Sequence, residues 1–507
     1  MTRPFRLSSH TSPLRIDLCK TSVSVLLVEL KVHMKSHLLP SFALGMGFIA
    51  VALNCLFSFA QDSPSKATSI DKAQTAKSKN PYQVSFADFD WQLKDSIPLF
   101  DGMVEIEERM PTQKAIDLFL SRVQKGPSDY ASRSILGELY LRQATEEDNL
   151  PSYNLAKGVL QDALKINSNY KPAIVGMAKV LMAQHQFADA LAILSKSIPA
   201  ESQGPADLAL IADCHLETGD LAKTQSTLER LTLMEDSPPI VARQARLAEL
   251  SGDQPKALEL LESALRVVEL SSADPTEWHW YQWRLAGLNF DMGHLEKAQS
   301  LVQKVLDDDA IDERSKILLV KIQFAKGHSK DALGLLIDVV KSHPSPPALA
   351  MLGDLYDALG DSGNATKYWD HAEQLVREEA LIAKVAHARE AAIFFADHDR
   401  NLNEALELIQ IDSEQRQDLH SRDAHSWILY KSKRLQEAKA KCLSAIEHGA
   451  FDLSCLYHAT KIHQSLGEDA LAKTYLQKII DVNPRFSIRY SADVANLQEM
   501  WNLSVSR

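Results

Sequence analysis

The chain has 507 residues, a formal net charge of −12 and 45% hydrophobic residues. It is longer than one ordinary domain and has enough apolar residues to bury a core. With only 19 Gly, 20 Pro and five Cys, it is neither collagen-like nor of low complexity, and it is not a disulfide-dense scaffold. The acidic balance argues against nonspecific binding to nucleic acid or to anionic membranes.

Residues 34–60 have the pattern of a secretory signal peptide. Lys35 makes a short basic start, a mostly apolar stretch follows, and Ser58 and Ala60 place small residues where cleavage requires them. We therefore predict an exported protein of the periplasm or cell envelope. Residues 1–33 do not resemble a domain, and we interpret them as a mis-assigned N-terminal extension before a true start at Met34.

Two other interpretations of this segment stay open. Residues 38–59 are long and apolar enough to remain as an uncleaved signal anchor, which would be the only expected contact with a membrane. A lipoprotein signal could instead use Cys55. Residues 61–85 are rich in Ser, Lys and Ala and lack a hydrophobic period, so they predict a disordered linker.

From about residue 103 the apolar residues recur with a helical period, and a repeat is visible. Small residues recur at intervals of 33 or 34, with two longer steps of 41 and 40. These ladder residues are Ala156, Ala190, Thr224, Ala257, Ala298, Ala332, Ala365, Ala405, Ala438 and Ala472. A large apolar residue follows four positions later in nearly every unit. This spacing predicts a helix in each unit, with the small residue and the large apolar residue on the same face.

A turn glycine stands five residues before the ladder position in six units. These glycines are Gly219, Gly252, Gly293, Gly327, Gly360 and Gly467, whereas Arg400 and Lys433 occupy the position in the eighth and ninth units. A small residue lets two helices approach closely, and the glycine lets the chain reverse between them. Because one such pair cannot bury its own apolar face, the pairs are expected to stack.

This pattern resembles the tetratricopeptide repeat family over residues 103–485. The seventh unit carries the family's signature positions in order: Leu352, Gly353, Tyr356, Gly360, Ala365, Trp369 and Ala372. The resemblance implies an all-α solenoid of about ten stacked helix-turn-helix repeats, wound into a right-handed superhelix with a concave groove. Thr224, Arg400 and Lys433 depart from the pattern of single units.

Irregular steps in the repeat predict local changes. Ala115 indicates a half-unit before the first full one, and an insertion is expected in an acidic turn at 145–148. A second insertion falls at 271–275. A third, at 377–386, contains no Gly or Pro and therefore predicts a lengthened helix. Residues 486–507 predict a capping helix and tail, which a solenoid needs to cover its last apolar face.

Nothing in the sequence predicts catalysis, a cofactor or a metal. The motifs of zinc peptidases, nucleotide-binding loops and serine hydrolases are all missing. His294 and His328 are expected to be exposed turn residues, and the pairs His420/His425 and His458/His463 to lie on the surface. Cys214, Cys442 and Cys455 are expected to be buried apolar side chains. We therefore predict a protein that is not an enzyme.

The most specific local feature is a run of three Trp within residues 278–283. Carried over from the family, the groove positions of this unit are Trp280, Trp283, Gly287 and Phe290. The same register gives Arg314, Ile317, Lys321 and Phe324 in the next unit, and Asp354 and Asp357 in the seventh. An aromatic, partly basic groove of this kind is typical of binding hot spots. The alternative is that one or two of the Trp rings only fill the gap left by the insertion.

A weaker aromatic cluster, Trp427 with Tyr430, is a second candidate for binding. Together these features predict a non-catalytic interaction scaffold or adaptor that holds a peptide or protein segment in its groove, with no nucleic acid as partner. Two alternatives remain: a solenoid that binds glycans, because Trp stacks on sugar faces, and a non-catalytic subunit of an envelope enzyme complex.

Overall fold

The computed structural model describes residues 111–147, 149–270, 275–446 and 452–506. The predicted signal peptide, its alternatives and the linker at 61–85 lie outside these ranges. Within them the chain forms α-helices joined by short turns, with one 3₁₀ turn at Ala200–Ser202 and no strand. The predicted all-α class is therefore confirmed for the described residues.

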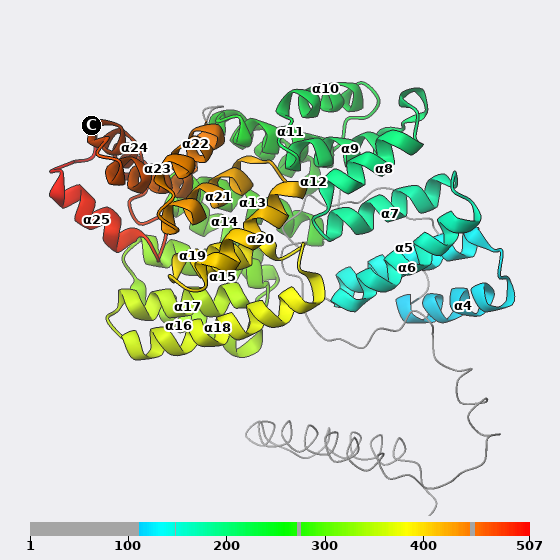
Figure 1. Cartoon of the computed structure of the whole chain (residues 1–507), viewed down its shortest axis with the longest axis horizontal. Helices are drawn as coiled ribbons and strands as arrows, with labels where there is room; N and C mark the ends of the chain where they lie inside the picture. The colour runs from blue at the N-terminus through cyan, green and yellow to red at the C-terminus, as the bar shows by residue number, and fades with distance from the viewer. Residues whose placement is uncertain (1–110, 148, 271–274, 447–451, 507) are drawn as a thin grey trace, which may run out of the picture. The chain divides into compact units, whose positions relative to one another are not determined.

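The helices follow one another with short connections (Figure 1). They are α4 (Thr112–Lys125), α5 (Tyr130–Glu147), α6 (Leu150–Ile166), α7 (Lys171–Ala183), α8 (Phe187–Ser197), α9 (Pro205–Glu217), α10 (Leu221–Thr232), α11 (Pro238–Leu250), α12 (Gln254–Leu270), α13 (Pro275–Asp291), α14 (Leu295–Asp308), α15 (Glu313–Ala325), α16 (Ser329–Ser342), α17 (Pro346–Ala358), α18 (Ser362–Ala383), α19 (Ala388–Asp397), α20 (Leu402–Gln415), α21 (Leu419–Lys431), α22 (Leu435–Ile446), α23 (Leu453–Ser465), α24 (Asp469–Val482) and α25 (Ser491–Met500).

Consecutive helices from α5 to α24 pack in pairs, which gives ten helical hairpins in the described chain. All ten ladder residues are at most 1% exposed, so each lies at a tightly packed contact. The predicted half-unit is α4, and the predicted cap is α25, which packs on α24. The solenoid of about ten repeats is thus confirmed.

The turns within the hairpins follow the predicted chemistry. All six turn glycines have positive φ, between 74° and 89°. His185 and Lys433 take the same conformation in units that have no glycine there. In the eighth unit the sequence placed Arg400 at this position, but Asp399 and Asn401 on either side of it have the positive φ. Asn and Asp tolerate this conformation better than a long cationic residue does.

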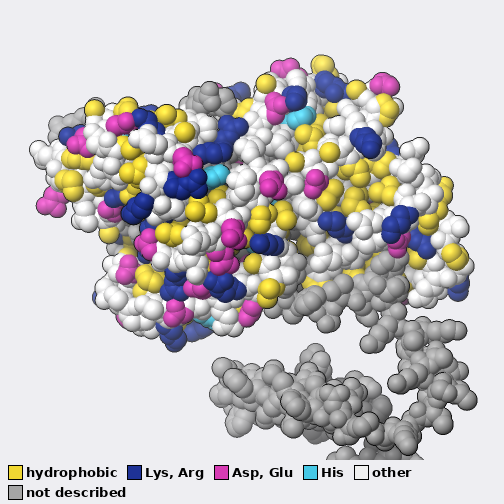
Figure 2. Space-filling model, in the orientation of Figure 1, with side chains coloured by type: hydrophobic (Ala, Val, Ile, Leu, Met, Phe, Trp, Pro, Cys, Tyr) yellow, Lys and Arg dark blue, Asp and Glu magenta, His cyan; other side chains and the backbone are white. Residues whose placement is uncertain are grey.

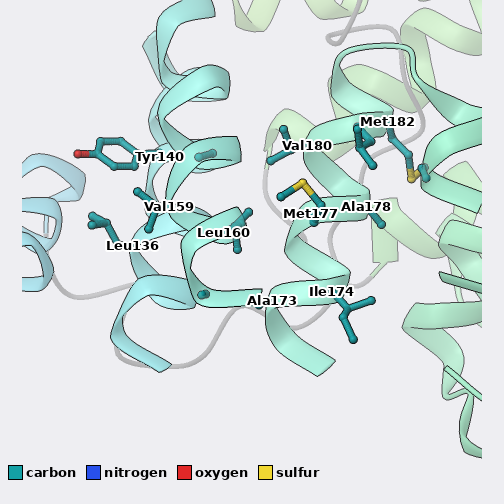
Figure 3. Close-up of a cluster of buried hydrophobic side chains, with 14 of the residues drawn as sticks. Leu136, Tyr140, Val159, Leu160, Ala173, Ile174, Met177, Ala178, Val180 and Met182 are labelled. Carbon is teal, nitrogen blue, oxygen red and sulfur yellow. The ribbon is translucent and has the colours of Figure 1, made fainter. Parts of the chain in front are cut away.

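Small residues allow the helices of a pair to approach closely. A Cβ on Gly137 of α5 would lie 2.5 Å from Cγ of Leu160 on α6, and a Cβ on Gly353 would lie 2.4 Å from the ring of Trp369. Figure 3 shows Leu160 among buried side chains of α5, α6 and α7, including Leu136 and Ile174. Burying one such Leu stabilises the fold by about 1.5–3 kcal/mol. This interlocking repeats along the array and forms its core.

The insertions have different outcomes. The third one lengthens a helix as predicted, because α18 runs for 22 residues. The prediction of an acidic turn at 145–148 was wrong for Thr145 to Glu147, which continue α5 for a last turn. Glu146 is held there by Arg142 on the same helix and by the Thr112 hydroxyl of α4. Residues 271–274 lie outside the described ranges.

Repeats far apart in the sequence also touch each other. Helix α8 contacts α20 (Figure 1), and the backbone N–H groups of Gln417 and Asp418 both donate to the carbonyl of Glu217, at 3.0 and 3.2 Å. Farther along, a Cβ on Gly293 would lie 2.2 Å from the carbonyl oxygen of Val482. Early and late repeats of the solenoid are therefore packed directly against one another.

The surface is mixed in charge. Figure 2 shows Lys and Arg side chains interspersed with Asp and Glu over the visible face. Among the described helices, none combines the length and the apolar character that a membrane span requires.

Candidate functional site

A cavity of about 650 Å³ lies between the first helices of four consecutive hairpins: α13, α15, α17 and α19. Residues 486–490, just before α25, close one side of it. Its charged lining consists of Asp291, Glu313, Asp354, Glu379, Glu390 and Asp397 together with Arg284, Arg314, Lys321 and Arg489. These first helices are the ones on which the sequence predicted a groove.

One face of α13 forms a wall of the cavity. Trp283, Gly287, Phe290 and Asp291 recur at helical spacing and all line it. A Cβ on Gly287 would meet no atom within 4 Å, so this glycine opens into free space. The guanidinium of Arg314, from α15, lies 5.5 Å from the centre of the Trp283 ring. The wall is aromatic beside Trp283 and acidic at Asp291.

Most of the predicted groove residues lie together at this cavity. They are Trp283, Gly287, Phe290, Arg314, Ile317, Lys321 and Asp354. Phe324 is not among the lining residues and instead packs under the guanidinium of Arg485, 4.4 Å from its ring centre. Asp357, one turn beyond Asp354, is exposed outside the cavity, with an oxygen 3.9 Å from Arg489.

Trp280 has a different environment from the one predicted. It is 4% exposed, does not line the cavity and belongs to a hydrophobic cluster with Leu265 and Val268 of α12. The edge of its ring meets Tyr281, with ring centres 4.9 Å apart. Helix α12 is 17 residues long, and its last turns supply the apolar surface that covers this ring. The packing interpretation therefore describes the position of Trp280, whereas Trp283 faces the cavity.

The side chain of Asp291 has no hydrogen bond or ion pair within the described residues. Burial and the nearby carboxylates of Asp452 and Glu249 raise the pKa of Asp291 to about 7, against smaller opposing effects of Lys321 and Arg284. The residue is enclosed by neighbouring helices but keeps solvent-exposed surface, and it lines the cavity. Arg284 is engaged elsewhere, with its guanidinium 2.7 Å from Glu249. The lining of the cavity thus includes a carboxyl group that forms no ion pair within the described residues.

The segment before α25 is seated against the same inner face. The guanidinium of Arg489 lies over Trp369, 5.2 Å from its ring centre, and reaches Asp354 at 3.5 Å. Arg489 also donates to the backbone carbonyl of Asp397 at 2.5 Å, and the Tyr490 hydroxyl donates to the Asp397 carboxylate at 2.6 Å. The sequence predicted a cap but gave no sign that residues before it would enter the groove.

His458 anchors this segment, and the prediction that the pair His458/His463 lies on the surface was wrong, because His463 is also buried. His458 is 5% exposed, with Nδ1 2.9 Å from Asp423 and Nε2 3.2 Å from the Tyr490 hydroxyl. Burial opposes the charged imidazole, but the charge and hydrogen bond of Asp423 outweigh it and raise the pKa of His458. Trp427 stacks on His458 at 4.2 Å and is 4% exposed. Trp427 is therefore packed inside the fold, and Tyr430, which stacks on it at 5.0 Å, is half-buried.

A second missed feature is a buried charged layer between early and late repeats. Arg416 and Asp412 are 2% and 1% exposed and form an ion pair at 2.5 Å, and Arg416 lies 3.3 Å from His185 of an early repeat. Burial and the carboxylate of Asp418 raise the pKa of Glu217 to about 7. These residues stand far apart in the sequence, so no local pattern could have indicated that they meet.

The other reactive side chains are placed as packing groups. Cys214, Cys442 and Cys455 are buried and unpaired as predicted, and burial raises the pKa of each thiol. Across the described ranges, no group of three or more His, Cys, Asp or Glu has the arrangement of a metal site. The cavity offers binding surfaces of aromatic, basic and acidic character.

Comparison with known proteins found distant similarities to solved structures and one match to a family model. The chain is similar to a tetratricopeptide repeat protein from Parabacteroides merdae, with 14% identity, a TM-score of 0.38 and coverage of 49% of this chain and 94% of that one. It is similar to yeast Tom70 with 13% identity, a TM-score of 0.31 and coverage of 77% of this chain and 92% of that one. It is also similar to the human IFIT1 dimer with PPP-AAAA, with 12% identity, a TM-score of 0.38 and coverage of 74% of this chain and 94% of that one. No curated protein matches the chain. The similarities to solved structures are too distant to bear on function. A family model of the tetratricopeptide repeat matches residues 152–214, so this stretch of the solenoid is identified as tetratricopeptide repeat sequence.

Proposed function

We propose that this protein is a non-catalytic interaction scaffold or adaptor that binds a peptide or protein segment in the cavity described above. The observation that supports this most is the convergence of Trp283, Phe290, Arg314, Lys321 and Asp354 on one cavity of about 650 Å³. Such a volume accommodates a few side chains of an extended segment.

The chemistry of the lining is suited to a peptide. Aromatic and Arg side chains are the residues that contribute most to binding at protein interfaces. Trp283 is half-buried and supported on one side by Arg314, so its indole is held in place before a partner arrives. A preformed aromatic wall reduces the conformational entropy lost on binding.

The test is to fill the cavity without disturbing the fold. Gly287→Trp places an indole in the open space beside Trp283. Gly334→Trp is its matched control, because Gly334 is also a helical glycine with no atom within 4 Å of a built Cβ and does not line the cavity. The probe is a phage-displayed library of random hexapeptides, selected on the full chain.

We expect peptides that bind the wild-type chain and Gly334→Trp but not Gly287→Trp, while the melting curves of the two variants coincide with that of the wild type. Trp283→Ala should weaken the same peptides. If selection enriches no peptide that Gly287→Trp excludes, the cavity does not bind peptides and the proposal is wrong.

A glycan-binding solenoid is a second candidate, supported by the half-buried indole of Trp283 beside the hollow at Gly287. A glycan array probed with the same three proteins separates the two functions. Sugars retained by the wild type and Gly334→Trp but lost from Gly287→Trp would favour this candidate. A non-catalytic subunit of an envelope enzyme complex would instead co-purify with its enzyme through another surface.

We also propose that the protein acts in the cell envelope. The support is the sequence pattern of residues 34–60 alone. Mass spectrometry of the chain recovered from the envelope fraction gives its first residue. A mature chain that begins after Ala60 would agree with export and cleavage, and a chain that retains residues 38–59 in the membrane fraction would indicate the anchor. A chain found only in the cytoplasm would contradict the proposal.

A further inference from the structure

A segment of the chain itself is bound on the inner face of the solenoid, next to the cavity. Residues 485–490 read Arg-Phe-Ser-Ile-Arg-Tyr and lie against the inner face of the solenoid. Arg485 places its guanidinium 4.4 Å from the Phe324 ring centre and donates from Nε to the Phe324 carbonyl at 3.1 Å. Ile488 is 7% exposed, in a cluster with Val320 and Leu352. Basic groups over rings and carboxylates, with apolar side chains between them, are thus already seated on this face.

The cavity beside this segment is also lined by aromatic, apolar and acidic side chains. Residues 486–490 form part of its lining but do not fill it. Six carboxylates and four Lys or Arg side chains line it, and several of the carboxylates already have basic partners, such as Glu390 with Arg389 at 3.0 Å. Arg489 faces Asp354, whereas no cation in the described chain pairs with Asp291 within 4.0 Å. Lys321 is close enough to act on Asp291 electrostatically but not to form an ion pair. A positive group from a partner would complete this site.

The distance between the aromatic and acidic parts of the site follows from helix geometry. Trp283 and Asp291 are on one face of α13 and eight positions apart, which is about 12 Å along the helix axis. An extended peptide spans about 3.3–3.6 Å per residue. The two side chains that reach Trp283 and Asp291 are therefore three or four residues apart in the partner.

We propose that the segment bound in this cavity carries a Lys or Arg side chain at Asp291 and an apolar or aromatic side chain at Trp283, three or four residues away. This inference rests on the proposed function and names the chemical class of its partner. A cation at Asp291 adds a charge-assisted hydrogen bond where the chain supplies none, and the apolar side chain covers the indole and the hollow at Gly287.

Sequencing the selected hexapeptides tests the proposal directly. We expect Lys or Arg to be enriched three or four positions from an aromatic or large apolar residue. Asp291→Asn, which keeps the shape of the side chain, should weaken these peptides by about tenfold or more. Lys321→Met should increase their affinity, because it removes from the cavity a charge of the same sign as the peptide's Lys or Arg.

The pH dependence of binding gives a second measurement. Asp291 faces Glu249 and Asp452 on the acidic side and Arg284 and Lys321 on the basic side. Its pKa of about 7 means that it gains charge between pH 6 and 8. A basic peptide should bind more tightly at pH 8 than at pH 6, and the Asp291→Asn variant should not show this change.

Other outcomes separate the two proposals. If the peptides excluded by Gly287→Trp are acidic and are lost with Lys321→Met, the cavity binds peptides but this inference is overturned. Enrichment of basic peptides that bind equally to Asp291→Asn also overturns it. If Gly287→Trp excludes no peptide, both this inference and the proposed function fail.

Discussion

The turn glycine Gly219 lies directly against the backbone of Gln417. A Cβ on Gly219 would be 2.2 Å from the carbonyl oxygen of Gln417, and the Gln417 N–H donates to the Glu217 carbonyl at 3.0 Å. Side chains can rotate out of such a contact, but a backbone carbonyl held by neighbouring hydrogen bonds cannot. This glycine therefore has two roles, because it reverses the chain within one hairpin and admits a late repeat against an early one.

Gly219→Ala should consequently destabilise the protein more than the same change at another turn. Gly327→Ala is the control, since Gly327 also has positive φ but a Cβ there would meet no atom within 4 Å. Both variants carry about 1–2 kcal/mol of backbone strain. The clash with Gln417 should add about 1–3 kcal/mol to Gly219→Ala alone. Urea denaturation measures the difference, and equal midpoints would contradict the contact between repeats.

Substitution of Trp280 should mainly reduce the stability of the fold, whereas substitution of Trp283 should mainly reduce peptide binding. Trp280 is 4% exposed within the core, so Trp280→Ala should cost about 3–5 kcal/mol of stability. Trp283 is half-buried at the cavity and packs only on the edge of the same cluster, so Trp283→Ala should cost clearly less stability than Trp280→Ala and should mainly reduce peptide binding. Thermal melting followed by circular dichroism, together with peptide titration, checks both. Loss of stability in Trp283→Ala as large as in Trp280→Ala would place both rings in the core.

The buried pair Arg416–Asp412 gives a prediction about the charged layer. Arg416→Met leaves Asp412 buried without its cation and should cost about 3–5 kcal/mol. Burial already raises the pKa of Asp412 despite Arg416, so the carboxylate is poorly compensated even in the wild type. The double variant Arg416→Met/Asp412→Leu should therefore recover much of the loss. A double-mutant cycle from urea curves measures the coupling, and additive losses would show that the pair does not act as a unit.

Glu217 should make stability depend on pH. Its pKa in the folded protein, about 7, lies above the ordinary value of about 4.5 for an unfolded chain. The folded state therefore binds more protons in this range, and stability falls as pH rises from about 4.5 to 7, by at most about 1.4 kcal/mol per unit. Asp418, Arg416, Arg389 and Arg246 act on this carboxyl group.

Glu217→Gln keeps the shape of the side chain and removes this titration. We expect the variant to gain stability relative to the wild type between pH 5 and pH 8, as measured by urea midpoints at both values. Parallel pH profiles for the two proteins would mean that Glu217 is not protonated in the folded state.

The repeat could be derived from the sequence because its signal is local and periodic. Ala156 and the other ladder residues are buried where the 34-residue spacing places them, and glycines such as Gly360 have positive φ where the chain reverses. Trp283, Arg314 and Lys321 could be assigned to one groove because stacked hairpins repeat the same helical register. The exception is Trp280, whose environment depends on how far the neighbouring α12 extends.

The contacts between distant repeats could not be predicted from the amino-acid pattern. The pairing of Arg416 with His185, the seating of Arg489 and Tyr490 in the groove, and the burial of His458 join residues with no periodic relation in sequence. The helical hairpins, their stacking and the register of the inner face could be predicted from the amino-acid pattern, because they depend on contacts within one repeat or between neighbouring repeats. Which distant repeats contact each other depends on the rotation between successive repeats. These small rotations add up along the array, and no single repeat contains their sum.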